Sequence, residues 1–121
     1  VCEARKLLGE DKIVGATAKT VEQARKAYSE GADYLGTGAI FPTTTKVKTV
    51  LTPVSRLNDV CRSVPIPVVA IGGLNAGNMD VLNGSPIDGI AVVSAIMKSA
   101  DPEAAARELF ARVRVIKENN R

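Results

Sequence analysis

The feature that most constrains the fold of this chain is a short apolar run followed by an amphipathic helical segment, a unit that recurs along the sequence. The runs alternate little between apolar and polar residues, so each is predicted to be a strand buried on both faces. Strands that alternate with helices in this way predict an α/β fold, a parallel sheet with helices packed outside it. The four predicted strands are residues 12–18, 33–40, 68–71 and 88–93.

Five helices are predicted around these strands from their start and stop signals. Thr20 and Gln23 form a capping box before the second helix, and Thr52 followed by Pro53 predicts a cap and a first helical residue for the third. Cys61 is expected to face the core. The predicted helices are residues 3–8, a helix from Thr20 to Gly31, one from Pro53 to Val64, a short one capped by Asn75 or Asn78, and a long one from Asp101-Pro102.

The carboxyl ends of the four strands are expected to lie on one edge of the sheet. Strand–helix–strand crossovers are right-handed, which gives parallel strands a common direction. Thr17, the Gly72-Gly73 pair and Ser94 each follow or end a predicted strand, and a run of three threonines follows another. The sequence therefore predicts that these groups share one edge.

The threonine run, Thr43 to Thr45, is suited to holding an anion. It offers three hydroxyl groups and three backbone N–H donors, and Lys46 adds a point charge that suits phosphate. Gly36 and Gly38 in the preceding strand allow a close approach of another backbone or a ligand. The alternative is an ordinary polar surface loop.

A second anion site is predicted after the last two strands. No G-x-G-x-x-G precedes a helix, which argues against a doubly wound sheet, whereas a (β/α)8 barrel binds phosphate in the loops after its last two strands. Gly73 has no side chain to block a phosphate, and Ser94 would begin a one-turn helix that presents free N–H groups. The alternative for the glycine pair is a tight turn.

Composition excludes several classes of function. The chain has 121 residues, a net charge of +3 and 3% aromatic residues, which does not suit a nucleic-acid-binding protein. It has two cysteines and no histidine, so a zinc site and a histidine general base are excluded and reduced thiols are expected. We expect no membrane span, no signal segment and a cytoplasmic location.

Three stretches together resemble the C-terminal half of thiamin phosphate synthase. They are residues 31–46, with Phe-Pro-Thr-Thr-Thr-Lys at their end, residues 68–74, with Ile-Gly-Gly-Leu, and residues 88–96, with Val-Val-Ser-Ala-Ile. The resemblance implies that residues 1–121 are the C-terminal half of a TIM-type (β/α)8 barrel. It also implies the coupling of hydroxymethylpyrimidine diphosphate to thiazole phosphate, with release of pyrophosphate and help from Mg²⁺.

The resemblance further implies a role for each matching residue. Lys46 is the expected catalytic residue, because it would stabilise the departing pyrophosphate, and Thr17 would face the same group. Relatives usually carry serine at Thr17 and often histidine at Lys19. The residues expected to bind thiazole phosphate are Thr43, Thr44, Thr45, Gly73, Val93 and Ser94.

The two metal-binding aspartates of this family lie in its first four strands, so Mg²⁺ ligands are not expected here. Four strands cannot close a barrel, so two sheet edges and the inner face of the barrel are expected to be left open. The chain is therefore expected to pair with an N-terminal half or with another copy through its open sheet edges, and to be inactive alone. A related thiazole tautomerase is a less favoured alternative. That enzyme uses a histidine in the region of Lys19, and this sequence contains no histidine. Barrel-type sugar-phosphate isomerases would need acid and base residues that are not found, and a non-catalytic phosphate-binding or assembly half-barrel stays open.

Overall fold

A computed structural model of the chain describes residues 1–41 and 51–119. Its centre is a four-stranded sheet in the order β1-β2-β3-β4, in which every neighbouring pair is parallel. This confirms the predicted α/β class and the predicted parallel sheet of four strands. The strands are β1 (Gly15–Thr17), β2 (Tyr34–Thr37), β3 (Val68–Ile71) and β4 (Gly89–Ala91).

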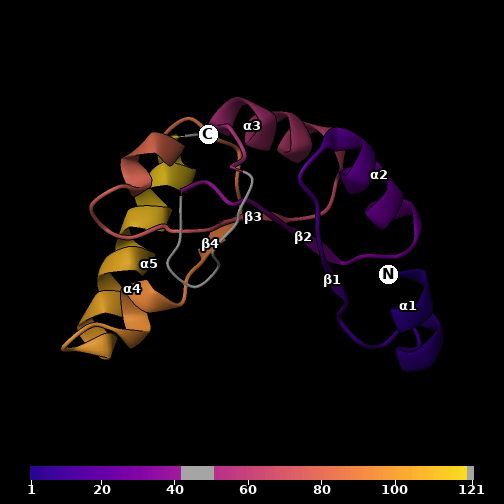
Figure 1. The fold of residues 1–121 in the computed structure, drawn as a ribbon, viewed down its shortest axis with the longest axis horizontal. Helices are drawn as coiled ribbons and strands as arrows, with labels where there is room; N and C mark the ends of the chain where they lie inside the picture. The colour runs from indigo at the N-terminus through magenta and orange to yellow at the C-terminus, as the bar shows by residue number, and fades with distance from the viewer. Residues whose placement is uncertain (42–50, 120–121) are drawn as a thin grey trace.

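The helices lie on the outer side of the curved sheet. Figure 1 shows α1, α2, α3 and α5 following one another around that side, with the strands crossing the middle of the molecule. No helix in residues 1–41 and 51–119 is both long enough and apolar enough to cross a membrane. The helical elements are α1 (Cys2–Leu8), α2 (Val21–Ser29), α3 (Val54–Ser63), the 3-10 helix η1 (Met79–Leu82), α4 (Ser94–Met97) and α5 (Pro102–Asn119).

Only one face of the sheet is buried in the described part of the chain. Leu35 pairs with Val68 in register and both are buried beneath the helices. On the opposite face the side chains of Tyr34 and Ile71 are 42% and 41% exposed. The burial on both faces that the strand pattern predicts is therefore not found in the described residues, because the helices cover one side only. The other face is left open, as expected for four strands that cannot close a barrel.

The core lies between the sheet and the helices. Leu57 and Val60 of α3 and Leu109 and Ile116 of α5 are buried against it. Full burial of an aliphatic side chain of this size contributes about 1.5–3 kcal/mol. Cys61 is partly buried and packs against this cluster, which agrees with its predicted position.

The predicted signals at the start of α2 and at the end of α1 are confirmed. Thr20 Oγ1 accepts a hydrogen bond from Gln23 N at 3.1 Å, and Gln23 Oε1 accepts one from Lys19 N at 2.8 Å. This is a capping arrangement in which each side chain satisfies a backbone donor at the start of α2. Gly9 ends α1 with a φ of 79°, a left-handed conformation that favours glycine.

The amino ends of the strands are joined by two similar aspartates. Asp33 donates its N–H to Val14 O at 2.7 Å and accepts from Val14 N through Oδ2 at 2.8 Å. Asp88 makes the same pair of bonds with Val68, at 2.9 and 3.0 Å. The Val14 N–H and then the Arg5 guanidinium, 2.7 Å from Asp33, hold the Asp33 pKa below its usual value of 3.8. The two aspartates therefore link neighbouring strands at the amino edge of the sheet.

Candidate anion-binding site at the carboxyl edge of the sheet

The described members of the predicted site follow the carboxyl ends of parallel strands. Thr17 is the last residue of β1 and is exposed, Gly73 lies two residues beyond β3, and Val93 and Ser94 lie just beyond β4. Because β3 and β4 are neighbours, Gly73 and Ser94 follow adjacent strand ends. Thr17 ends β1, which is separated from β3 by β2. The predicted common edge is confirmed for these residues. Thr43, Thr44, Thr45 and Lys46 lie outside the described residues.

The chain that leaves β2 runs directly beside the end of β3. Ile40 N donates to Ile71 O at 3.1 Å, and Phe41 N donates to Gly72 O at 3.0 Å. The two backbones approach so closely that a Cβ on Gly38 would overlap the Ile71 carbonyl oxygen. The expected need for glycine at position 38 therefore has a direct steric cause.

Thr52 holds the same segment from the other side. Its Oγ1 donates to Gly38 O at 2.7 Å, and its N–H donates to Ala39 O at 2.7 Å. The prediction that Thr52 caps the next helix, with Pro53 as its first residue, is wrong: Pro53 occupies the cap position of α3, which has no side-chain cap. The Thr52 hydroxyl instead donates to the carbonyl of Gly38, a buried residue whose polar backbone atoms need partners.

The glycine pair after β3 forms a turn held by an asparagine. Gly72 and Gly73 have φ values of 107° and 64°, which side chains disfavour. Asn78 Nδ2 donates to Gly73 O at 2.9 Å, and its Oδ1 accepts from Asn75 N at 2.9 Å. Asn78 precedes η1 but its side chain does not cap that helix, so a capping role for Asn78 is wrong. Asn75, the other candidate, accepts a hydrogen bond from Gly77 N through Oδ1 at 2.8 Å. Sequence reasoning missed its bond to Gly73, for which the only signal was a turn-forming residue soon after the glycine pair.

Several backbone donors at this edge have no acceptor in the described part of the chain. The N–H groups of Gly73, Ser94 and Ala95 donate to no backbone oxygen there. The last two belong to the first turn of α4, where helix geometry leaves N–H groups free. Val93 precedes α4 and its side chain is 64% exposed. Such an arrangement of N–H groups can receive a phosphate.

Within residues 1–41 and 51–119, no group of three or more His, Cys, Asp or Glu side chains is placed to hold a metal ion. The carboxyl edge therefore offers N–H and hydroxyl donors rather than metal ligands in the described part of the chain. Thr17 supplies an exposed hydroxyl at the end of β1, and Lys19 follows it by two residues.

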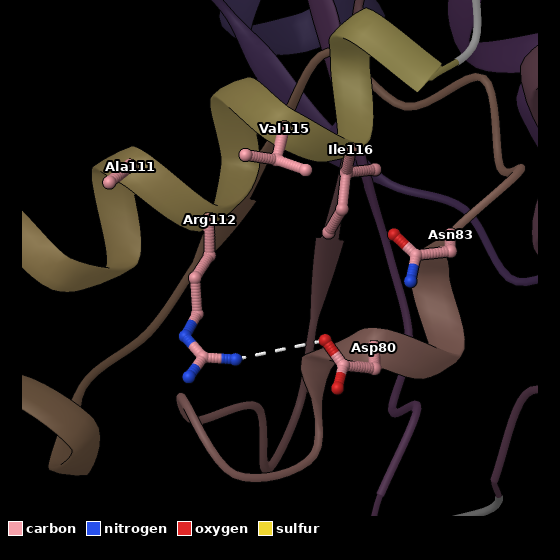
Figure 2. Close-up of a pocket in the computed structure, with 6 residues that line it drawn as sticks. All are labelled: Asp80, Asn83, Ala111, Arg112, Val115 and Ile116. Atoms are coloured by element: carbon pink, nitrogen blue, oxygen red, sulfur yellow. Dashed lines mark ion pairs between the residues drawn. The ribbon is translucent and has the colours of Figure 1, made fainter.

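A cavity of about 260 Å³ lies elsewhere, between η1 and α5. Figure 2 shows Arg112 of α5 facing Asp80 of η1, with an ion pair of 3.7 Å between them. Both side chains are well exposed, at 41% and 79%, so solvent weakens this pair. None of the predicted site residues lines the cavity, whose walls come from η1, the residue after it and α5.

Comparison with known proteins identifies the family. The family model described as thiamine monophosphate synthase matches residues 1–96. The chain belongs to the thiamine monophosphate synthase family. This confirms the resemblance carried by the three stretches of sequence.

Two relatives illustrate the extent of the match. The chain is 57% identical to thiamine-phosphate synthase 2 of Streptococcus pneumoniae serotype 4 over 86% of this chain and 50% of that protein. It is 41% identical to the thiamine-phosphate synthase of Lacticaseibacillus paracasei over 100% of this chain and 57% of that protein. The chain thus spans about half the length of the relatives it matches.

A solved structure supports the fold assignment. The chain superposes on the thiamine phosphate pyrophosphorylase of Pyrococcus furiosus with a TM-score of 0.83 and 38% identity, covering 96% of this chain and 55% of that one. Four parallel strands with outer helices therefore correspond to half of a TIM-type barrel, as the resemblance implied.

Proposed function

We propose that residues 1–121 form the half-barrel of a thiamin phosphate synthase that binds thiazole phosphate. The reaction joins the thiazole nitrogen to the methylene carbon of hydroxymethylpyrimidine diphosphate and releases pyrophosphate. Family membership supports this activity, and the geometry of the carboxyl edge supports the assignment of the thiazole phosphate site to this chain.

The observation that carries the proposal is the junction between the ends of β2 and β3. Phe41, the last described residue before the threonine segment, bonds to Gly72 O at 3.0 Å. Thr52, seven residues after Thr45, bonds to Gly38 and Ala39. Both flanks of Thr43 to Thr45 are thus anchored beside the glycine turn, which favours one site built from both.

In this site the phosphate of the thiazole substrate accepts hydrogen bonds from the backbone N–H groups of Gly73, Val93 and Ser94. The described N–H donors of Gly73 and Ser94 have no backbone acceptor in the described residues, which fits such a role. Thr43, Thr44 and Thr45 hold the thiazole. Backbone donors that are fixed before the ligand arrives need no reorganisation when it binds.

Lys46 and Thr17 serve the other substrate. The aminopyrimidine is electron-rich, so its bond to the diphosphate breaks to give a stabilised cation, and the thiazole nitrogen then captures that cation. Lys46 neutralises charge on the departing pyrophosphate, and Thr17 offers it a hydroxyl. No enzyme base is needed, which agrees with a sequence that contains no histidine.

The rest of the barrel and the Mg²⁺ ligands come from the half of the relatives that this chain does not cover. In the described residues β1 pairs only with β2 and β4 only with β3, so both outer strands have an open edge. Tyr34 and Ile71 are exposed on the uncovered face of the sheet. A second half-barrel, rather than another copy, closes these edges, and the chain alone has no synthase activity. The assembled enzyme works in the cytoplasm.

The thiazole tautomerase alternative is less favoured, because the matching relatives are thiamine-phosphate synthases and no histidine is present. A non-catalytic phosphate-binding half-barrel would bind thiazole phosphate but would not turn over when the second half is supplied. The following experiment distinguishes this case from a synthase.

The chain is titrated with thiazole phosphate by calorimetry, then mixed with a separately produced second half taken from the S. pneumoniae relative and assayed for thiamin phosphate. We expect binding by the chain and turnover only by the mixture. In the mixture Lys46→Ala should lower turnover by about 10²-fold or more, the cost of losing one charge-stabilising group. Lys48→Ala removes the same charge two residues away and should have little effect. A mixture that never forms thiamin phosphate, although both halves bind each other, would refute the synthase assignment.

A further inference from the structure

Thr52 makes two hydrogen bonds to consecutive carbonyl groups of the chain that leaves β2. Its Oγ1 bonds to Gly38 O and its N–H to Ala39 O, each at 2.7 Å. The Thr52 side chain is only 2% exposed, so the Gly38 carbonyl has no access to water through this side. Loss of the hydroxyl would leave that carbonyl without this donor, and the segment would have to shift to find another.

The segment held by Thr52 cannot shift independently of β3. A Cβ on Gly38 would overlap Ile71 O, and a Cβ on Gly72 would lie 2.6 Å from the Cα of Ala39. The backbones are therefore already at van der Waals contact, and movement of one displaces the other. Thr52 acts at this contact although it lies 14 residues along the chain from Gly38.

Gly73 follows this contact directly, and its carbonyl is held on the other side by Asn78 at 2.9 Å. We propose that Thr52 is a positioning residue that, through Gly38 and Gly72, fixes the position of the Gly73 backbone N–H, and so determines the affinity for the phosphorylated thiazole. It touches no ligand and acts through Gly38 and Gly72. This inference rests on the proposed function.

The chain offers a matched control for Thr52→Val. Thr37 in β2 is also a fully buried threonine, but its Oγ1 has no hydrogen-bond partner among residues 1–41 and 51–119. Thr37→Val therefore makes the same chemical change without breaking a described bond. Thr52→Ser keeps the hydroxyl and tests whether the bond to Gly38 is what matters.

The affinity of each variant for thiazole phosphate is measured by calorimetry at a temperature where circular dichroism shows it to be folded. Thr52→Val should weaken binding at least about tenfold, because displacements of about 1 Å in a binding site are costly. Thr52→Ser should recover most of the affinity, and Thr37→Val should bind like the wild type. If Thr52→Val does not fold, Thr52→Ala and Thr52→Ser are compared instead, since they differ only in the hydroxyl.

A folded Thr52→Val, or Thr52→Ala in its place, that binds with the wild-type affinity overturns the positioning role while the proposed function stands. Equal losses in Thr52→Val and Thr37→Val also overturn it, because they would show that any buried threonine is needed. Failure of the wild-type chain to bind thiazole phosphate, alone or with the second half, overturns the proposed function and this inference with it.

Discussion

Replacing Gly72 by alanine should be among the most damaging small changes in this chain, for two reasons that can be separated. Its φ of 107° is unfavourable for a residue with a Cβ, and that Cβ would lie 2.6 Å from both the Cα and the Cβ of Ala39. The backbone term costs about 1–2 kcal/mol. Overpacking against a neighbour that cannot move adds about 1–3 kcal/mol.

Two other glycines allow the backbone cost and the crowding cost to be measured separately. Gly84 has a φ of 86° with nothing within 4 Å of its Cβ position, so Gly84→Ala carries only the backbone term. Gly38 has no positive φ but would overlap Ile71 O, so Gly38→Ala carries only the crowding term. Gly72→Ala should therefore cost about 2–5 kcal/mol, a large part of the stability of a typical domain.

The assay is equilibrium urea unfolding followed by circular dichroism, with the free energy of unfolding compared among the three variants and the wild type. We expect the loss of stability in Gly72→Ala to exceed that in Gly84→Ala clearly. Equal losses, within about 0.5 kcal/mol, would show that the ends of β2 and β3 are not in close contact. A Gly38→Ala variant as stable as the wild type would lead to the same conclusion.

Two further predictions concern titratable groups. The pKa of Asp33 is lowered in the folded chain, so its stabilising effect should be complete above pH 4 and should be lost as the pH falls through the folded pKa. Urea unfolding of the wild type and Asp33→Asn between pH 2 and 5 should show their difference shrinking at low pH, and a constant difference would contradict the pKa shift. Burial, with the Asp88 carboxylate, raises the pKa of Cys61 to about 11, so at pH 8 a thiol reagent should modify exposed Cys2 first and Cys61 only after unfolding. Equal labelling rates for the two thiols in the folded chain would be inconsistent with this.

Local features of the fold followed from short stretches of sequence. The strand at residues 68–71 was predicted with the bounds that the structure has, because an apolar run between prolines and a glycine pair leaves little choice. The capping arrangement of Thr20 and Gln23 and the helix end at Gly9 were also predictable, since their partners lie within four residues. The predicted bounds of the other strands were less accurate. A strand ends where the adjacent strand no longer offers it hydrogen-bond partners, and the sequence of one strand does not show this.

The uncovered sheet face could be expected from a four-stranded half-barrel, but not from the strand pattern itself. Tyr34 and Ile71 are apolar residues in strands that read as buried on both faces, yet both are exposed in the described structure. A continuous apolar strand indicates that both faces are suited to burial, but not which part of a barrel covers each of them. Coverage by a second half-barrel is the proposal that accounts for this pattern.

The sequence by itself determined the parallel α/β architecture, the family and the sheet edge shared by the described members of the predicted anion site, because periodicity and motif order depend on neighbouring residues. The tertiary structure decided how that edge is held together. Thr52 looked like a helix cap and Asn78 like another, but their side chains bind Gly38 and Gly73. A buried carbonyl accepts from whichever donor the folded chain brings to it, so the roles of these two residues depend on contacts that only folding creates.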